Sequence, residues 1–435
     1  MPITSRRDFL AGLSAASAGV AALPALNETA FRRLFDAELV AGDRSAQSLS
    51  NDETYWSHIQ RAFDMDRTMI NLNNGGISPT PTHVLQQMLR DLQFVNELPV
   101  EHNWRVLEPR IESTRRELAR EFGCDGEEMA VTRNASESME TMILGLDLRR
   151  GDEVIITNQN YGRMITAWQQ RERRDGIVVK SVSFPVPLTD PQLLVRRIAE
   201  QMTPRTKAIE LPHITNLTGQ ILPIRDIVRL ARPRGIPVFV DGAHAFAHFP
   251  FTRDELECDY YGTSLHKWLH APIGAGFLYV RKDRIPGLWP LMAAEEKDTA
   301  NIRKYEQIGT HPQANFNAVS TALTFHRGIG VERKAARLRY LRDRWATALQ
   351  QASPRVRVLT ELGPDKAGAI CMFAVDGLDP SALGNWLMSR YRIVNTPIVH
   401  PEFAGIRITP SIYTTVDELD TFVGAVQTAM RNGIA

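Results

Sequence analysis

Short apolar runs alternate with amphipathic stretches through the middle of the chain, and this alternation predicts a parallel sheet with covering helices. One expected strand ends near Thr132, and the others span 152–157, 177–182, 207–212, 238–240, 260–261 and 275–280. Helical periodicity predicts helices over 82–95 and 106–122, from Ser136 onward, and over 164–173, 193–202 and 225–232. The fold class indicated by this part of the chain is α/β.

The pattern changes beyond residue 315. Two long helical stretches come first, at 318–328 and 331–350. They are followed by expected strands at 356–359, 369–375 and 405–409 and by expected helices at 380–390 and 416–430. The chain is therefore expected to have a helical N-terminal arm over 27–70, a large domain over 71–315 and a smaller α+β domain over 316–435.

Composition narrows the functional classes. A chain of 435 residues has ample length for more than one domain. Its 51 Lys and Arg against 50 Asp and Glu leave a formal charge of +1, so the electrostatic footprint of a nucleic-acid-binding protein is absent. The three cysteines, Cys124, Cys258 and Cys371, are widely scattered. Neither a metal site nor a disulfide framework is expected from that spacing.

The N-terminus reads SRRDFL from Ser5 to Leu10 and continues into an apolar region rich in Ala and Gly up to Ala25. This pattern resembles a twin-arginine signal peptide over residues 1–26. It predicts export of the folded protein to the periplasm by the twin-arginine translocation machinery. The alternative is an ordinary amphipathic helix that carries two arginines. The segment is too short and too weakly apolar to favour a permanent membrane span.

The chemically most informative stretch is 237–279. The apolar run Val238–Val240 ends in Asp241, at the carboxyl end of an expected buried strand, where open α/β sheets bind ligands. Lys267 follows on a polar loop between two further apolar runs. A lysine that forms a Schiff base and a carboxylate that pairs with a pyridinium nitrogen are what pyridoxal phosphate (PLP) chemistry requires. Alone, the two residues are more simply explained as a surface lysine and a helix-capping aspartate, which account for most Asp and Lys residues in any protein.

The residues around this pair carry a family resemblance. The chain reads DGAH over 241–244 and SLHK over 264–267, and this combination resembles the fold-type I PLP enzymes of aminotransferase class V. The longer pattern VDGAHA…HKWLHAPIGAGFLYV is most similar to the isopenicillin N epimerase-like branch, and the resemblance extends roughly from Asn71 to Tyr413. It implies a fold-type I transferase fold with a mostly parallel seven-stranded sheet, bound pyridoxal 5'-phosphate and a homodimer.

The resemblance also implies which residues contact the cofactor. The helix start after Asn134 would bind the phosphate, although a plain helix cap explains the same residues. Tyr161 would stack on the ring, and Thr310 would reach the phosphate of the partner subunit unless it lies on a plain loop. The implied cofactor-binding residues are Ala135, Ser136, Tyr161, Asn216, Asp241, His244, Ser264, His266, Lys267 and Thr310. Lys267 and Asp241 are the implied catalytic residues.

Two segments are implied to contact the substrate. The turn 73–76, NNGG, would lie at the substrate mouth, where glycines let backbone N–H groups approach a ligand closely. Asn74 and Gly75 are its candidate residues, and a bare turn is the alternative. Arg407 would bind the substrate carboxylate through two N–H groups of its guanidinium, although an arginine on a strand is usually a surface residue.

One departure from the family limits the reaction. Cysteine desulfurases carry a nucleophilic cysteine shortly before this arginine, and residues 392–405 contain none. Cys371 lies in an apolar run and is expected in the core. Epimerisation, transamination, β-lyase chemistry and oxidative decarboxylation share the remaining residues. We expect an exported enzyme that acts at Cα of an amino-acid-like substrate, such as a group within a maturing siderophore. A PLP-dependent C–S or β-lyase and a non-catalytic binding protein are the alternatives.

Overall fold

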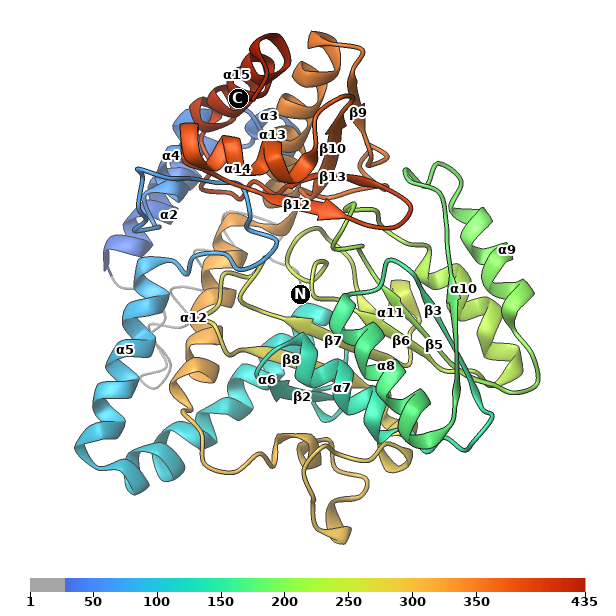
Figure 1. Ribbon diagram of the computed structural model, residues 1–435. Helices are drawn as coiled ribbons and strands as arrows, with labels where there is room; N and C mark the ends of the chain where they lie inside the picture. The colour runs from blue at the N-terminus through green and yellow to red at the C-terminus, as the bar shows by residue number, and fades with distance from the viewer. Residues whose placement is uncertain (1–27, 435) are drawn as a thin grey trace.

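The computed structural model describes residues 28–434, and a seven-stranded sheet forms the centre of its large domain (Figure 1). Its strands are β2 (Met129–Thr132), β3 (Glu153–Thr157), β4 (Val178–Val182), β5 (Thr206–Pro212), β6 (Val238–Asp241), β7 (Tyr260–Ser264) and β8 (Gly276–Val280). The spatial order is β2-β8-β7-β6-β5-β3-β4, and β8 runs antiparallel to both of its neighbours while the other pairs are parallel. The expected mostly parallel seven-stranded sheet is confirmed. The twin-arginine segment lies outside the described residues.

The sheet is buried on both faces because helices cover each side. Alternate residues of a strand point to opposite faces. Phe239 accordingly packs with α7 (Ala135–Gly145) and α8 (Gly162–Asp175), whereas Val238 and Val240 pack in the larger core on the other face. That core contains apolar residues of α6 (Glu108–Phe122), α9 (Pro191–Gln201), α10 (Ile224–Ala231) and α12 (Ala314–Ile329). Burial on both faces explains why these strands read as continuous apolar runs.

The small domain is an antiparallel sheet covered by helices. Its strand order is β12 (Thr396–Val399), β13 (Ala404–Ile408), β10 (Cys371–Val375) and β9 (Val356–Val358). The covering helices are α13 (Val331–Ala352), α14 (Pro380–Tyr391) and α15 (Val416–Asn432). Trp345, Phe373 and Phe422 hold this core together, with ring centroids 5.6 to 5.8 Å apart in edge-to-face contact. The sequence patterns did not predict β12, since its proline cannot donate to the strand ladder.

The segment before the large domain is attached to the small domain. Helices α2 (Glu28–Ala41), α3 (Ala46–Leu49) and α4 (Glu53–Gln60) lie beside α13, where Arg337 donates to the Ser50 carbonyl (3.1 Å) and to the Glu53 carboxylate (2.5 Å). A short parallel pair then joins β1 (Ile70–Asn71) to β11 (Ile393–Val394). This pairing brings the turn at 73–76 beside the end of β13.

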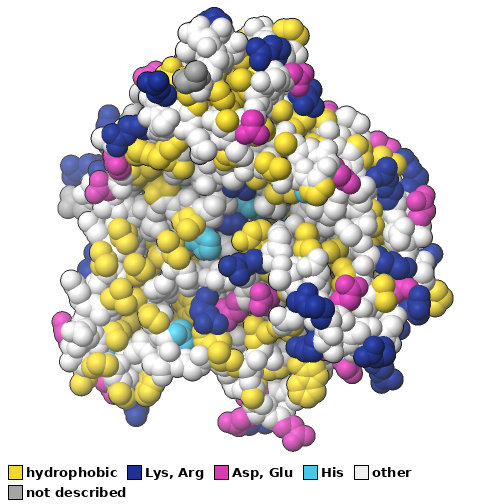
Figure 2. Space-filling view, in the orientation of Figure 1, with side chains coloured by type: hydrophobic (Ala, Val, Ile, Leu, Met, Phe, Trp, Pro, Cys, Tyr) yellow, Lys and Arg dark blue, Asp and Glu magenta, His cyan; other side chains and the backbone are white. Residues whose placement is uncertain are grey.

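The remaining helical segments complete the large domain. They are α5 (Thr82–Glu97), the π-helix η1 (Glu101–Leu107), α11 (Arg253–Leu256) and the 3-10 helices η2 (Gly126–Glu128), η3 (Arg232–Arg234), η4 (Lys282–Gly287), η5 (Glu296–Asp298) and η6 (Ile302–Glu306). Figure 2 shows hydrophobic side chains gathered on the surface over α5, where Leu85, Leu89 and Leu92 are exposed. Within residues 28–434, no helix combines the length and the apolar composition that a bilayer crossing requires.

One histidine connects the two domains next to the sheet's carboxyl edge. The His248 ring donates from Nδ1 to the His244 carbonyl (2.7 Å) and accepts at Nε2 from the Ala369 amide (2.7 Å). It also stacks on Trp268, with ring centroids 3.6 Å apart. Burial lowers the pKa of His248 to about 3, so the ring stays neutral and keeps both bonds. The small domain is thereby fixed to the segment that follows β6.

Candidate active site

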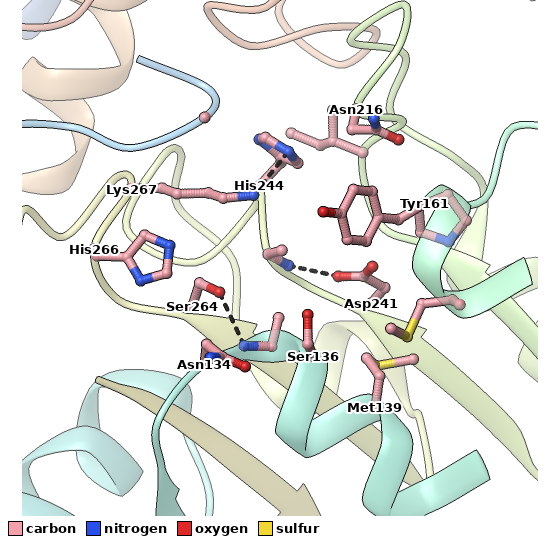
Figure 3. A pocket seen from close by; sticks show the side chains of 16 residues that line it. Asn134, Ser136, Met139, Tyr161, Asn216, Asp241, His244, Ser264, His266 and Lys267 are labelled. Atoms are coloured by element: carbon pink, nitrogen blue, oxygen red, sulfur yellow. Dashed lines mark hydrogen bonds between the residues drawn. The ribbon is translucent and has the colours of Figure 1, made fainter. Parts of the chain in front are cut away.

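A cavity of about 190 Å³ lies at the carboxyl ends of β5, β6 and β7, beside the start of α7 (Figure 3). Ligand sites in open α/β sheets occur at this edge because the strands deliver their final side chains there together. The structure brings nine of the ten expected cofactor residues to this cavity. They are Ala135, Ser136, Tyr161, Asn216, Asp241, His244, Ser264, His266 and Lys267.

Lys267 and His244 lie side by side in the lining of the cavity. The Lys267 amine Nζ lies 3.1 Å from His244 Nε2. Burial lowers the pKa of Lys267 to about 8, and the positive charge of Arg407 also lowers it. The negative charge of Asp241 acts in the opposite direction and raises it. Burial also holds the pKa of His244 well below its usual range, and the charge of Lys267 adds to the effect. His244 is therefore neutral and can accept a hydrogen bond from the lysine.

Asp241 is the last residue of β6, and its side chain faces the cavity. Its Oδ1 accepts a hydrogen bond from the Ala243 amide (2.9 Å). Burial raises the pKa of Asp241, whereas this amide and the Lys267 charge lower it. Gly242 follows, and a Cβ there would lie 1.9 Å from the Tyr261 ring. Only glycine fits that approach, so the tight turn after Asp241 depends on it.

The start of α7 forms the floor of the cavity. Asn134 is its N-cap and accepts from the Glu137 amide (2.9 Å), while Ser264 at the end of β7 accepts from the Ala135 amide (2.9 Å). The Ser136 hydroxyl points into the cavity (Figure 3). A helix start with these groups is suited to an anion such as phosphate. Asn134 therefore caps the helix and also lines the cavity, so the two alternative roles considered for this helix start are compatible.

Tyr161 and Asn216 form the opposite wall. Figure 3 shows the Tyr161 ring entering the cavity from the side opposite to Lys267. Three buried polar atoms of the cavity have no hydrogen-bond partner within residues 28–434: Asn216 Oδ1, His244 Nδ1 and His266 Nδ1. Unsatisfied buried polar groups are costly, so these atoms are available to hydrogen-bond a bound molecule or water. A ligand with a phosphate, a basic ring nitrogen and an aldehyde fits the helix start, the acid and the amine.

Arg407 lies beside the cavity on β13 and is 7 % exposed. Its guanidinium donates from Nη1 to the Asn216 carbonyl (2.8 Å) and from Nη2 to Asn73 Oδ1 (2.8 Å) and Thr396 Oγ1 (3.3 Å). Burial lowers the pKa of Arg407 to about 10, which still leaves it charged near neutral pH. Within the described chain no carboxylate lies within ion-pair distance of Arg407. A buried cation without an anion is suited to a ligand carboxylate.

The turn at 73–76 packs against the end of β13, and its N–H groups are hydrogen-bonded within the chain. Asn74 is fully buried, and its amide donates to the carbonyls of Asn71 (3.1 Å) and Thr409 (2.9 Å). The Gly75 amide donates to Thr409 Oγ1 (3.0 Å), and the Gly76 amide donates to the Asn73 carbonyl (3.1 Å). These N–H groups are consumed within the chain because the turn packs against the end of β13. Gly76, and neither Asn74 nor Gly75, lines the cavity.

Thr310 is the expected cofactor residue that lies away from the cavity. It is exposed and lines a separate apolar groove of about 410 Å³ with Leu92, Val100 and Trp104. Its expected contact with the phosphate is therefore not made within one subunit.

Several cavity residues had not been singled out in the sequence. They are Gly76, Asn134, Met139, Met164, Pro212, Ile214 and Ala243. Met139 follows Ala135 by four positions on α7, and Met164 follows Tyr161 by three at the start of α8. Residues at these spacings share a helix face, so the spacing was a signal that could have identified both methionines.

Known proteins resemble this chain along most of its length. The sequence model of the aminotransferase class-V family matches residues 70–396. The isopenicillin N epimerase of Streptomyces clavuligerus is 28% identical over 388 residues, which cover 85% of this chain and 97% of the epimerase. A "Probable cysteine desulfurase" of Halobacterium salinarum is 28% identical over 331 residues, covering 71% of this chain and 78% of that protein.

Solved structures show the same fold. The cystine C–S lyase C-DES with its product cysteine persulfide matches with a TM-score of 0.74 at 24% identity, covering 83% of this chain and 98% of the lyase. A C-DES mutant with glycine covalently linked to its PLP cofactor matches with a TM-score of 0.76 at 23% identity, covering 85% and 98%. The fold is therefore the fold-type I PLP-dependent transferase fold. Since the family match spans most of its length, this chain belongs to the aminotransferase class-V family of PLP enzymes.

Proposed function

We propose that this PLP-dependent enzyme acts at Cα of an amino-acid-like substrate, in the manner of an epimerase or an aminotransferase. The observation that carries the proposal is the buried guanidinium of Arg407, which has no carboxylate within ion-pair distance in the described chain and whose charge reaches the Lys267 amine. A substrate with a carboxylate and an amino group on one carbon would satisfy both groups. When bound, PLP withdraws electrons from the Cα of an attached amine and so weakens each bond to that carbon.

The chain's own residues divide the remaining work. Lys267, with its pKa lowered to about 8, has a substantial unprotonated fraction near neutral pH and can take a proton from Cα. His244 accepts a hydrogen bond from that amine and so orients it. Asp241 supplies a buried negative charge that holds a proton on the ring nitrogen. Tyr161 supplies a flat surface for the ring.

The described structure offers no cysteine to a persulfide mechanism at this site. Cys124, Cys258 and Cys371 lie outside the cavity lining, and burial raises the pKa of Cys371 to about 12. A cysteine thiolate is the nucleophile in persulfide formation, so desulfuration through an internal cysteine is disfavoured. A C–S or β-lyase reaction needs no such thiol and is the second candidate, with a non-catalytic binding protein as the third.

The test is exchange of the Cα proton in deuterated water, followed by mass spectrometry with a panel of amino acids and small peptides. We expect deuterium at Cα of the accepted substrates. In the Arg407→Lys variant, kcat/KM should fall by about 10–100-fold, because one charge-assisted hydrogen bond contributes about 1.5–3 kcal/mol. Amines that lack a carboxylate are the control, and their slower exchange should be unchanged.

Each outcome of this experiment separates the candidates. Detection of pyruvate and ammonia as products, with sulfide from sulfur-containing substrates, would show that the enzyme is a β-lyase and would contradict the proposed epimerase or aminotransferase activity. Protein that binds PLP but catalyses neither exchange nor elimination with any member of the panel would favour the binding protein. An equal loss with carboxylated and uncarboxylated amines would show that Arg407 acts only on the fold.

We propose a homodimer that uses the apolar groove around Trp104, with Thr310 reaching the phosphate of the other subunit. Val100 and Trp104 are exposed and line this groove together with Thr310. Exposed apolar side chains that gather in one groove favour contact with another protein subunit. Trp104→Glu should shift the protein toward monomer in sedimentation velocity and weaken its PLP binding. A wild-type monomer with full PLP affinity would contradict this arrangement.

Export and tailoring of a peptide natural product, such as a siderophore, complete the proposal. Their support is the motif from Ser5 to Leu10, since metabolism of free amino acids is mostly cytoplasmic. Fractionation of the source cells checks this part, and protein confined to the cytoplasm would remove its basis.

A further inference from the structure

A second buried acid lies next to Asp241. In the parallel pairing of β5 with β6, Pro212 is opposite Asp241 and Glu210 is opposite Phe239. Paired residues on neighbouring strands share a face of the sheet, and so do residues two apart on one strand. Because Glu210 is paired with Phe239, two residues before Asp241, its side chain lies on the same face as Asp241, one layer further from the cavity. Glu210 is 1 % exposed.

The Glu210 carboxyl has few partners. The Trp168 indole of α8 donates a short hydrogen bond to Oε2, while Oε1 is buried with no partner in the part of the chain that the structure describes. The side-chain amide of Asn160, in the loop after β3, donates to the Glu210 carbonyl (3.2 Å). The Trp168 indole and the Asn160 amide both lower the pKa of the Glu210 carboxyl, against the larger effects of burial and of the Asp241 charge. The nearest strand neighbour on β6 is the apolar Phe239.

The charges around Glu210 are unevenly distributed. Among residues 28–434 no Lys, Arg or His lies within ion-pair distance of its carboxyl, and Asp241 is the charged group whose field reaches it. Asp241, in contrast, has the Lys267 charge and the Ala243 amide to stabilise its ionised form. Two buried carboxyls on one face do not both ionise readily, so the single charge resides on the acid with the better partners. Burial and the Asp241 charge raise the pKa of Glu210 to about 8.

We propose that Glu210 is a positioning residue for Asp241: it carries the proton of the acid pair, keeps the negative charge on Asp241, and releases its proton when a protonated ring nitrogen neutralises Asp241. The released proton goes to the ring nitrogen or to solvent, and no other bond changes. The inference depends on the cofactor of the family and is independent of the reaction that the enzyme catalyses.

The test is a count of protons that accompany PLP binding to the apoenzyme. Calorimetric titration in buffers of different ionisation enthalpy gives this count for the wild type and for Glu210→Gln. Glutamine keeps an oxygen for Trp168 but has no proton to release. We expect the wild type to take up fewer protons than Glu210→Gln, by up to one per site. Lys267 titrates in both proteins, so the difference isolates Glu210.

The matched control is Glu153→Gln. Glu153 is also a fully buried glutamate of this sheet, but Lys180 (2.6 Å) and Arg205 (2.7 Å) pair with it and hold its pKa down at about 2. It has no proton to release, so this variant should give the wild-type count. Equal counts for wild type and Glu210→Gln, or the same change in Glu153→Gln, would overturn the proposal.

A second measurement uses wild-type protein alone, so it does not depend on whether a variant folds. Infrared difference spectra of wild-type protein, with and without PLP, report whether a protonated carboxyl loses its C=O band when PLP binds. We expect a band to disappear in the range of buried carboxylic acids. A spectrum in which no protonated carboxyl changes on PLP binding would also overturn the proposal.

Discussion

Lys267→Ala is expected to abolish the covalent attachment of PLP and to lower kcat/KM by about 10²–10⁴-fold through loss of the proton-transferring amine. Alanine has no nitrogen to bond the aldehyde, and His244 then has no amine beside its Nε2. Borohydride reduction followed by intact-mass spectrometry measures the attachment, and steady-state kinetics measure the rate. The exposed lysine of β5, in the variant Lys207→Ala, is the control and should behave as wild type.

The role of Lys267 as a base also predicts how the reaction rate changes with pH. A base acts only in its unprotonated form, and the pKa of Lys267 is lowered to about 8. We therefore expect the wild-type rate to rise with pH up to about 8 and then level off, and the residual rate of Lys267→Ala to lack that rise. PLP that remains attached to Lys267→Ala after reduction would place the bond on another lysine.

Asp241→Asn is expected to retain PLP and to lower kcat/KM by about 10²–10³-fold, the usual loss when one charge-stabilising group is removed. Asparagine has nearly the same shape, and its side-chain oxygen can still accept from the Ala243 amide. It has no negative charge to hold a proton on the ring nitrogen, so the ring withdraws electrons less well. PLP content from absorbance and kinetics on the same preparation separate binding from catalysis.

The same variant should shift the acid side of the pH profile. The Asp241 charge raises the pKa of Lys267, so its removal should lower that pKa further and move the rise in rate to lower pH. Asp241→Glu, which restores the charge with a longer side chain, is the comparison and should recover part of the rate. A full rate in Asp241→Asn would show that this carboxylate does not act on the ring.

The sequence contained most of the site because its chemistry lies in short contiguous segments. DGAH and SLHK each lie where a buried strand ends, and both features are visible as an apolar run followed by polar residues. Strand ends converge at one edge of a parallel sheet, so residues far apart in the chain could be placed together in advance.

What the sequence could not predict depends on contacts between distant segments. The hydrogen bonds of Asn74 go to Asn71 and Thr409, and nothing local reveals that the second partner is 335 positions away. The β1–β11 pair involves two residues on each side, which is too few for a periodic signal. Glu210 reads as a polar residue within a strand, and only the register beside β6 reveals that it lies next to Asp241.

Arg407 joins three parts of the chain that are remote in sequence: it donates to the Asn216 carbonyl, to Asn73 of the turn at 73–76 and to Thr396 of β12. A carboxylic acid bound to this guanidinium would strengthen the non-covalent link between the three segments, and it would raise the melting temperature of the protein. At a concentration 100 times Kd the stabilisation is about 2.7 kcal/mol, whatever the later chemistry. Thermal melting of the Lys267→Ala protein with a library of carboxylic acids can thus identify the substrate class before any reaction is known.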